Sequence, residues 1–156
     1  MCVAGEVLAS GGYDTDFGHD AYQRLEKIMR AAGPSVDLGY KPLVGTLQTF
    51  NFKTSSATRL AVTRTTDALG RLGRVEGRDG ANALLYRRDY RYNDLNQRTR
   101  LTEDTGHFWD YGYDALGQVT ASAKKQPGGA ALPGFDFGYG FDSIGNRTYA
   151  MTNRQN

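Results

Sequence analysis

Three aspartates are the residues of this 156-residue sequence best suited to acid–base chemistry. Asp67, Asp114 and Asp142 could supply a carboxylate pair for glycoside hydrolysis, which needs two carboxyl groups about 5–10 Å apart. Each of them, however, opens an Asp-x-x-Gly segment. Asp at the first position with Gly at the fourth is typical of a type I β-turn. We therefore expect these aspartates to cap separate turns rather than to meet in an active site.

Other side chains that could carry chemistry are few and scattered. His19 and His107 lie far apart, and Cys2 is the only cysteine, so the soft ligands of a zinc site are lacking. His107 is interpreted as the entry to a strand rather than as a general base. No nucleophile–base pair or phosphate-binding loop can be assembled. The sequence therefore predicts no catalytic residue, no metal site and no cofactor.

One short pattern recurs along the chain: two aromatic residues one position apart, then Asp, two residues and Gly. The clearest copies are Tyr111–Val119 and Tyr139–Arg147, and Tyr90–Arg98 carries Asn93 and Asn96 in place of Asp and Gly. Copies that lack part of the pattern lie at Phe17–Leu25, Tyr40–Leu47 and Thr66–Leu72. The six copies follow one another at intervals of 21 to 28 residues. Repeats of this length are single supersecondary units that must stack on neighbours to bury an apolar face.

The Asp-x-x-Gly segment predicts the tip of a β-hairpin. A type I turn followed by a residue in the left-handed region closes a hairpin through a G1 bulge. Gly adopts that conformation freely and Asn is next best, whereas Gln23 would cost about 1 kcal/mol. The structural turn residues are predicted to be Asp20, Asp67, Gly70, Asn93, Asn96, Asp114, Gly117, Asp142 and Gly145.

The residues before these turns alternate as strands do. Aromatic residues alternate with Asp or Gly in two segments, at Phe135, Phe137 and Tyr139 and again at Trp109, Tyr111 and Tyr113. Strict period-two patterning places such aromatic residues on one face of a strand. With 20 glycines and 10 tyrosines, the composition also favours strands and tight turns. We predict an all-β fold of tandem hairpins.

One stretch allows two interpretations. Residues 20–32 place apolar side chains at helical spacing, with Asp20 and Gln23 as a capping box and Gly33-Pro34 as a stop, which predicts an amphipathic helix. Taken as a repeat, the same residues form a turn followed by a strand. The strand is favoured because Phe17–Asp20 matches the other copies.

Composition bounds the organisation and the partners. The net charge is +2 with no basic stripe, so nucleic-acid binding is not expected. No apolar run reaches the roughly 20 residues that span a bilayer, and no signal peptide is visible. The hairpin domain is expected over residues 13–150, between tails at 1–12 and 151–156. Residues 121–134, rich in Lys, Pro, Gly and Ala, are expected to form a long loop.

The repeat resembles the YD repeat of the RHS family, which comprises bacterial RHS proteins, the BC components of insecticidal Tc toxins and the animal teneurins. The resemblance rests on Tyr111–Val119, Phe141–Arg147 and Pro42–Gly45, and it extends from residue 13 to about residue 150. It implies hairpins joined edge to edge in a curved or spiralling antiparallel sheet, as part of the wall of a shell. Family shells contain many more than six repeats, so the chain would be a fragment of one.

The resemblance also implies a function. The chain would be a structural shell segment that encloses or displays a toxin, another C-terminal cargo or a cell-surface module, without catalysis of its own. Its partners would be other RHS-repeat segments or the cargo of a parent protein, and its destination secreted or at the cell surface. The alternative is a module that binds cell-surface carbohydrate, with Trp109, Tyr111 and Tyr113 stacking on sugar rings. Packing within the sheet is favoured for these aromatics, and an enzyme is the least favoured class.

Overall fold

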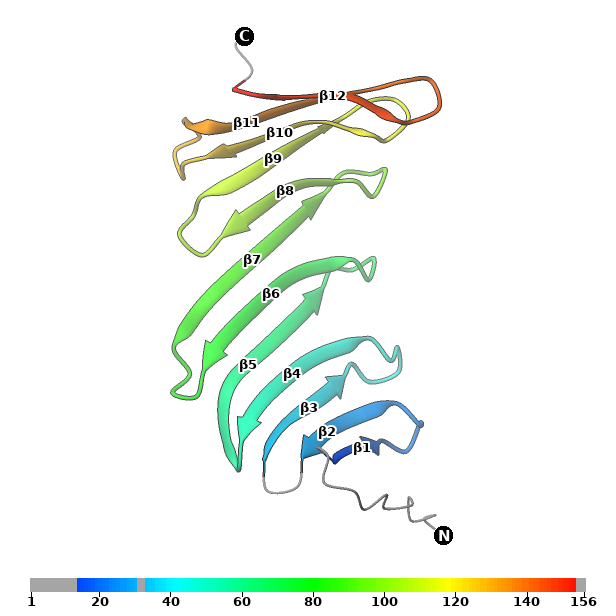
Figure 1. Cartoon of the computed structure of the whole chain (residues 1–156), viewed down its shortest axis with the longest axis vertical. Coiled ribbons are helices and arrows are strands. Elements are labelled where there is room, and N and C mark those ends of the chain that lie inside the picture. Colours follow the sequence, from blue (N-terminus) through cyan, green and yellow to red (C-terminus); the bar gives the residue numbers. More distant parts are fainter. Residues whose placement is uncertain (1–13, 31–32, 154–156) are drawn as a thin grey trace. The chain divides into compact units, whose positions relative to one another are not determined.

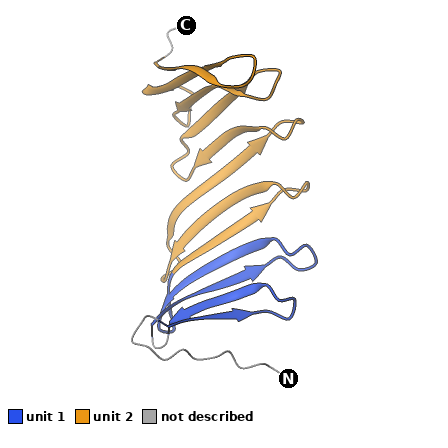
Figure 2. Cartoon of the chain, turned by 45° about the vertical axis from the view of Figure 1, so that its right-hand side comes forward, with its two compact units in different colours: residues 1–59 blue, residues 60–156 orange. Residues whose placement is uncertain are grey.

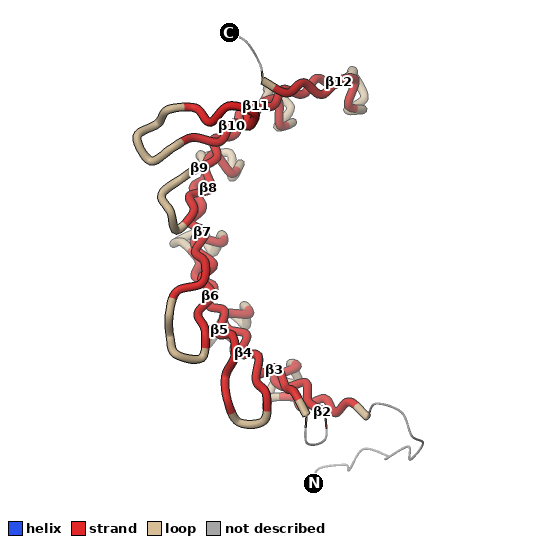
Figure 3. The backbone as a smooth tube through the Cα atoms, turned by 60° about the vertical axis from the view of Figure 1, so that its left-hand side comes forward, coloured by secondary structure: helices blue, strands red, loops and turns tan. Residues whose placement is uncertain are grey.

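The computed structural model describes residues 14–30 and 33–153, and every regular element within these ranges is a strand (Figure 3). No helix that could cross a bilayer occurs there. The described residues form twelve strands, which follow one another in the sheet in chain order (Figure 1). They are β1 (Thr15–His19), β2 (Leu25–Arg30), β3 (Pro34–Tyr40), β4 (Leu47–Thr54), β5 (Ala57–Thr66), β6 (Leu72–Asp79), β7 (Leu84–Tyr92), β8 (Arg98–Glu103), β9 (Phe108–Tyr113), β10 (Val119–Lys125), β11 (Ala131–Phe141) and β12 (Arg147–Thr152). The prediction of an all-β fold of tandem hairpins is confirmed.

The chain divides into two compact units, residues Met1–Arg59 and Leu60–Asn156 (Figure 2). In the first unit an apolar row crosses β1 to β4. The register places Phe17 opposite Ile28, Ile28 opposite Val36, and Val36 opposite Phe52. Cross-strand pairs of this kind stabilise a sheet by roughly 0.2–1 kcal/mol each.

In the second unit the two faces of the sheet differ in character. Trp109 and Asp110 are neighbours on β9 and therefore point to opposite faces. On the side of Asp110, its carboxylate pairs with Arg100 at 2.7 Å and with Lys125 at 3.1 Å. On the side of Trp109, the indole packs against Phe137 of β11. Around β9, one face thus carries the ion pairs of Asp110, and the other carries the stacked rings of Trp109 and Phe137 together with the ion pair of Lys124 and Glu103.

Little of the sheet is buried. Among the residues described, the buried apolar side chains are Val62 at 9% exposure and Phe108 at 8%, and no side chain is below 2%. A single layer of strands leaves both faces in contact with solvent unless another layer covers them. The hydrogen-bonded ladders, the turns and the cross-strand pairs therefore carry most of the stability.

The segment after Asp20 is a turn and a strand, as favoured, and not a helix. The amide of Gln23 donates to the carbonyl of Asp20 at 2.9 Å, and β2 follows from Leu25. Gln23 has a φ of 61°, the left-handed conformation expected at this position. Residues 31 and 32, the end of the predicted helix, lie outside the described residues.

The long loop expected at residues 121–134 is wrong. β10 continues to Lys125 and β11 begins at Ala131, so the connection is a tight turn. The amide of Gly129 donates to the carbonyl of Gln126 at 2.8 Å, and the amide of Gln126 donates to the carbonyl of Ala130 at 2.8 Å. Composition misled because the neighbouring strands supply hydrogen-bond partners to Ala and Lys residues whose intrinsic strand preference is low.

The expected domain boundaries shift slightly. β12 runs to Thr152, two residues past the expected end of the hairpin domain at 150, because the amide of Asn153 donates to the carbonyl of Asp136 at 2.6 Å and holds the last residues in the ladder. The N-terminal tail expected at 1–12 lies outside the described residues, as do residues 154–156.

Candidate functional site

The predicted turn residues all lie at hairpin tips and share one geometry. At Asp67 the carboxylate oxygen Oδ1 accepts hydrogen bonds from the amides of Leu69 and Arg71, both at 2.9 Å. The amide of Gly70 donates to the carbonyl of Asp67 at 3.0 Å, and Gly70 has a φ of 78°. The same pair of side-chain bonds, to the second and fourth residues onward, recurs at Asp20, Asn93, Asp114 and Asp142. These side chains stand at separate tips and act as turn caps.

The copy of the repeat at Tyr40–Leu47 also forms a turn, but a longer one. The amide of Lys41 donates to the carbonyl of Thr46 at 2.8 Å, and that of Gly45 donates to the carbonyl of Lys41 at 3.1 Å. Leu43 and Gly45 both have positive φ, 69° and 67°. This tip therefore closes with one more residue than the tip at Asp67, where the amide of Asp67 donates to the carbonyl of Arg71.

Acid should weaken the capped turns. Hydrogen bonds from Arg24, Arg71 and Asn146 lower the pKa values of Asp20, Asp67 and Asp142, respectively, below the usual value of 3.8. A lowered folded-state pKa contributes stability that is present above the unfolded pKa and is lost as pH falls through the folded one. We expect urea midpoints to fall progressively below about pH 4. An Asp67→Asn/Asp142→Asn double variant should show a flatter profile, and an equally steep profile would assign the acid sensitivity to other groups.

Side chains that follow the turns reach the next turn of the sheet; we call this series of contacts the turn ladder. The guanidinium of Arg71 bonds its own Asp67 and also donates to Oδ1 of Asn96 at 2.9 Å and to the carbonyl of Asn93 at 3.2 Å. Nε2 of Gln97 lies 3.3 Å from the point that a β-carbon on Gly117 would occupy.

The same contact recurs at two other steps of the turn ladder. Nη1 of Arg24 lies 3.3 Å from the β-carbon position of Gly45, and Nε2 of Gln118 lies 3.3 Å from that of Gly145. In the first unit and in the second, the residue four positions after the start of one turn therefore packs on the next turn. The absence of a β-carbon on the receiving glycines leaves room for it.

The tyrosine before the turn makes a second link between hairpins. The hydroxyl of Tyr40 donates to the carbonyl of Leu25 at 2.7 Å, that of Tyr92 to Leu72 at 3.0 Å, and that of Tyr113 to Arg98 at 2.8 Å. Each acceptor lies five residues after the start of the preceding turn. This bond gives the Tyr-Asp pair of the repeat a physical role. In the last hairpin Phe141 occupies the tyrosine position and has no hydroxyl to donate.

Removing one of these hydroxyls should destabilise the fold modestly. We expect Tyr92→Phe to lower the free energy of unfolding by about 1 kcal/mol, because the carbonyl of Leu72 loses its donor while the ring stays in place. Urea denaturation followed by circular dichroism measures the change. Tyr22→Phe is the matched control, since Tyr22 is 79% exposed at a tip. Equal effects of the two substitutions would contradict the assigned role.

The structure separates the three candidate stacking aromatics. The ring of Trp109 lies 6.1 Å from that of Phe137, nearly parallel to it, and 6.1 Å from that of Phe135, edge-on. Lys124 lies over the same indole and pairs with Glu103 at 2.9 Å. Trp109 is therefore engaged within the sheet by rings of β11.

Tyr111 and Tyr113 lie instead along an open depression in the second unit, which we call the tyrosine hollow. It has a volume of about 480 Å³ and is also lined by Tyr92, Tyr139 and Arg98. Burial raises the pKa of Tyr111 above its usual value of 10.0, so its hydroxyl stays protonated near neutral pH. Phenol rings beside polar groups can bind a ring-shaped polar ligand by stacking and hydrogen bonding.

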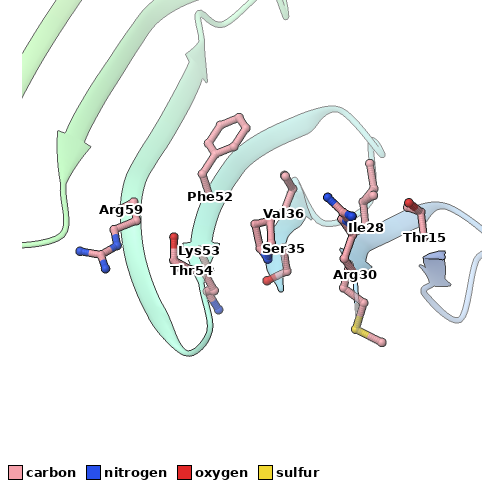
Figure 4. A pocket seen from close by; sticks show the side chains of 11 residues that line it. Thr15, Ile28, Arg30, Ser35, Val36, Phe52, Lys53, Thr54 and Arg59 are labelled. Carbon is pink, nitrogen blue, oxygen red and sulfur yellow. The ribbon is translucent and has the colours of Figure 1, made fainter. Parts of the chain in front are cut away.

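A second depression lies in the first unit, over the apolar row (Figure 4). Its volume is about 410 Å³, and Ile28, Val36 and Phe52 line it together with Arg59. Lys53, at its border, is paired with Asp37. The groove is the part of the apolar row that the single layer of strands leaves uncovered.

In each unit the hairpin tips carry exposed apolar side chains that sequence reasoning did not single out. The third residue of each predicted turn is 72% to 106% exposed: Tyr22, Leu43, Leu69, Leu95, Leu116 and Ile144. Large apolar side chains at this exposure mark contact surfaces when they are contiguous. The Leu or Ile that precedes the turn glycine in the repeat was the sequence signal that could have revealed these exposed side chains.

Sequence reasoning also missed three turns of the same form at the other ends of the strands. They are Asp79–Asn82, Glu103–Gly106 and Gln126–Gly129. In each, as at Asp67, the amide of the first residue donates to the carbonyl of the fifth, and the amide of the fourth donates to the carbonyl of the first. Oδ1 of Asp79 even accepts from the amides of Ala81 and Ala83, at 2.9 and 2.8 Å. A residue able to adopt positive φ three positions after Asp, Glu or Gln was the signal that could have revealed them.

No arrangement for metal binding is assembled in the part of the chain that the structure describes. Groups of three or more His, Cys, Asp or Glu side chains able to hold a metal do not occur there. Three arginines of β7 and β8 form ion pairs: Arg87 with Asp89 at 3.1 Å, Arg88 with Asp104 at 3.3 Å, and Arg100 with Asp110 at 2.7 Å. The features with a repeated design are the turn ladder and the tyrosine links, both of which join one hairpin to the next.

Comparison with known proteins supports the fold and no finer assignment. No model of a protein family matches the chain, and no curated protein sequence matches it. Among solved structures, the TcdB2–TccC3–Cdc42 complex matches with 16% identity over 90% of this chain and a TM-score of 0.53. The Tc holotoxin pore of Photorhabdus luminescens, with mutated TccC3, matches with 15% identity over 90% of the chain and a TM-score of 0.52. This chain spans only 9% of each matched chain. At this identity the similarity establishes a common fold with part of the Tc toxin structures.

Proposed function

We propose that the chain is a structural segment of an RHS/YD-type wall, in which each hairpin is held by the next. The observation that carries the proposal is the repeated linkage between hairpins. Arg71 and Gln97 contact the following turn, and Tyr92 and Tyr113 bond the carbonyl of a preceding hairpin. Nearest-neighbour contacts of this kind are the basis of stability in repeat proteins.

Two further observations support a part in a larger assembly. The sheet is one layer thick with Val62 and Phe108 as its buried apolar side chains within the described ranges. In each unit the apolar side chains at the hairpin tips, such as Tyr22 in the first and Ile144 in the second, are largely exposed. Surfaces of this kind are covered by partner elements in assembled proteins. The hairpin tips and the open faces of each unit are therefore the surfaces that neighbouring wall elements would cover.

The partners we propose are other RHS-repeat segments, or a C-terminal cargo enclosed within a parent protein, with a secreted or cell-surface destination. The fold similarity to part of the TcdB2–TccC3 structures supports this assignment. We propose no catalytic role for the chain. The aspartates best suited to catalysis are engaged as turn caps, as at Asp67 and Asp114.

A double-mutant cycle tests the linkage on which the proposal depends. Arg71→Ala and Asn96→Ala should each destabilise the chain, and their coupling energy should be about 0.5–1 kcal/mol because the side chains are directly bonded at 2.9 Å. Arg71→Ala combined with Asp104→Ala is the control, and these two effects should add. Additive effects in both cycles would show that the contact between Arg71 and Asn96 does not contribute to stability.

The tyrosine hollow favours a second candidate function, binding of cell-surface carbohydrate. Tyr111 and Tyr139 line it beside Arg98, a combination suited to a sugar ring. Glycan-array binding that Tyr111→Ala abolishes and Asp114→Ala leaves intact would favour this function. Trp109→Ala distinguishes binding at the tyrosine hollow from binding at the Trp109–Phe137 pair, since Trp109 packs on Phe137 and does not line the hollow. Absence of binding to any glycan would leave the structural role alone.

A further inference from the structure

The outer edge of β12 is the feature from which we draw a further inference. β12 is the last strand of the sheet, paired on one side with β11. All six of its residues are exposed, and Tyr149 and Met151 remain 52% and 48% exposed. Its sequence, RTYAMT, contains neither the Pro nor the Lys that commonly block edge strands, and its one charged residue is Arg147 at the start.

The backbone groups of β12 alternate between β11 and the open side. The amide of Asn153 donates to the carbonyl of Asp136, and the register places Met151 opposite Gly138 and Tyr149 opposite Gly140. Because hydrogen-bonded residues alternate along an antiparallel ladder, Ala150 directs its amide and carbonyl away from β11. The amide of Ala150 is therefore available to a further strand.

The links between hairpins define what such a strand must carry. In three hairpins the carbonyl five residues after the start of the turn accepts a tyrosine hydroxyl from a later strand: Leu25 from Tyr40, Leu72 from Tyr92, and Arg98 from Tyr113. The equivalent carbonyl in the last hairpin is that of Arg147. Among the described strands none lies on that side of β12.

The turn ladder ends at the same place. Arg71, Gln97 and Gln118 each reach the turn that follows their own. The equivalent residue of the last turn is Asn146, whose Nδ2 donates to its own Asp142 at 3.0 Å, as Nε of Arg71 does to Asp67 at 2.7 Å. Both the hydroxyl acceptor and the ladder residue are therefore present at β12, in the positions that contact a following hairpin elsewhere in the sheet.

We propose that the outer edge of β12 binds a β-hairpin bearing the Tyr-Asp-x-x-Gly turn, in antiparallel register, with the tyrosine hydroxyl on the carbonyl of Arg147. This partner deepens the proposed structural role and rests on it. The bound strand pairs with Ala150, and the glycine of its turn packs on Asn146. Main-chain pairing supplies affinity, while the hydroxyl and the turn supply selectivity for this repeat.

The test uses the full chain and a labelled peptide of residues 105–126, which is the β9–turn–β10 hairpin with Tyr113 in the required position. Fluorescence anisotropy should show saturable binding. Ala150→Pro in the chain should weaken it at least tenfold, because proline removes the outward amide but no bond to β11. Ala150→Ser, which keeps the amide, is the matched control and should bind as the unaltered chain does. Circular dichroism establishes that both variants remain folded.

The peptide itself carries the second comparison. Tyr113→Phe in the peptide should weaken binding by about fivefold, the loss of one hydrogen bond. No saturable binding, or equal affinity for the chain with and without Ala150→Pro, overturns the proposal. Equal affinity of the two peptides overturns the role of the Arg147 carbonyl. The coupling between Arg71 and Asn96 is measured without the peptide. If that coupling is present but the peptide does not bind, the edge site is refuted and the structural role still holds.

Discussion

Replacing Gly77 with valine is expected to lower the free energy of unfolding by about 2 kcal/mol, the largest single effect we expect in the second unit. Gly77 is buried on β6 and lies directly opposite Tyr86 of β7, whose ring covers it. A β-carbon on Gly77 would overlap three atoms of that ring. The valine would force the tyrosine ring off the sheet and remove the apolar contact that the ring makes there. Urea unfolding monitored by circular dichroism measures the loss.

Two comparisons isolate this cause. Tyr86→Ala combined with Gly77→Val should cost less than the sum of the two single changes, because the ring that clashes is gone. Gly128→Val is the control: a β-carbon there would meet no atom within 4 Å, and stability should change by no more than about 0.5 kcal/mol. A Gly77→Val variant as stable as Gly128→Val would contradict the packing of Tyr86 on the glycine. Gly140 and Tyr149 form the same pair on β11 and β12.

Asp67→Ala is the second change expected to have a large effect, a clear fall in the urea midpoint at pH 7. The carboxylate accepts two amide bonds within its own turn. Its Oδ2 also accepts from Arg71 at 2.7 Å, and the guanidinium of Arg71 lies 4.7 Å from the centre of the Tyr92 ring. Alanine therefore uncaps one turn and releases the side chain that holds the next. Urea denaturation at pH 7 gives the measured value.

Asparagine at position 67 separates the contribution of the turn cap from that of the negative charge. Asn93 already caps its turn through Oδ1, which accepts from the amides of Leu95 and Gln97 at 3.1 and 2.9 Å. Asp67→Asn should therefore keep most of the stability that Asp67→Ala loses. Asp104→Ala, which breaks only an exposed ion pair with Arg88, should have little effect. If Asp67→Asn were as damaging as Asp67→Ala, the charge rather than the cap would be the contribution of Asp67.

Local features of this fold could be predicted from the sequence because their causes are local. An Asp or Asn followed three positions later by Gly or Asn sets both the cap and the left-handed residue, and Asn96 and Gly117 have φ values of 62° and 82°. The strand after Asp20 was predicted against a helical spacing of apolar residues, because the repeat around it carried more information than the periodicity.

Features that depend on neighbouring strands could not be predicted in the same way. The segment 121–134 is strand for most of its length because β9 and β11 pair with β10, which composition does not reveal. Trp109, Tyr111 and Tyr113 share one strand and one face, yet Trp109 packs on Phe137 while the two tyrosines line the hollow. Register between strands decides such contacts, and a single repeat unit does not encode it.

We propose that the chain is a wall segment whose outer β12 edge pairs with a further hairpin. Light scattering coupled to size exclusion, with a circular dichroism spectrum of the same peak, tests it most directly. We predict β-rich material that associates as its concentration rises, with Ala150→Pro shifting the distribution toward monomer, because the outward amide of β12 is then missing. A β-rich species that stays strictly monomeric over the same concentrations, with or without the proline, would contradict the claim and indicate a self-sufficient domain.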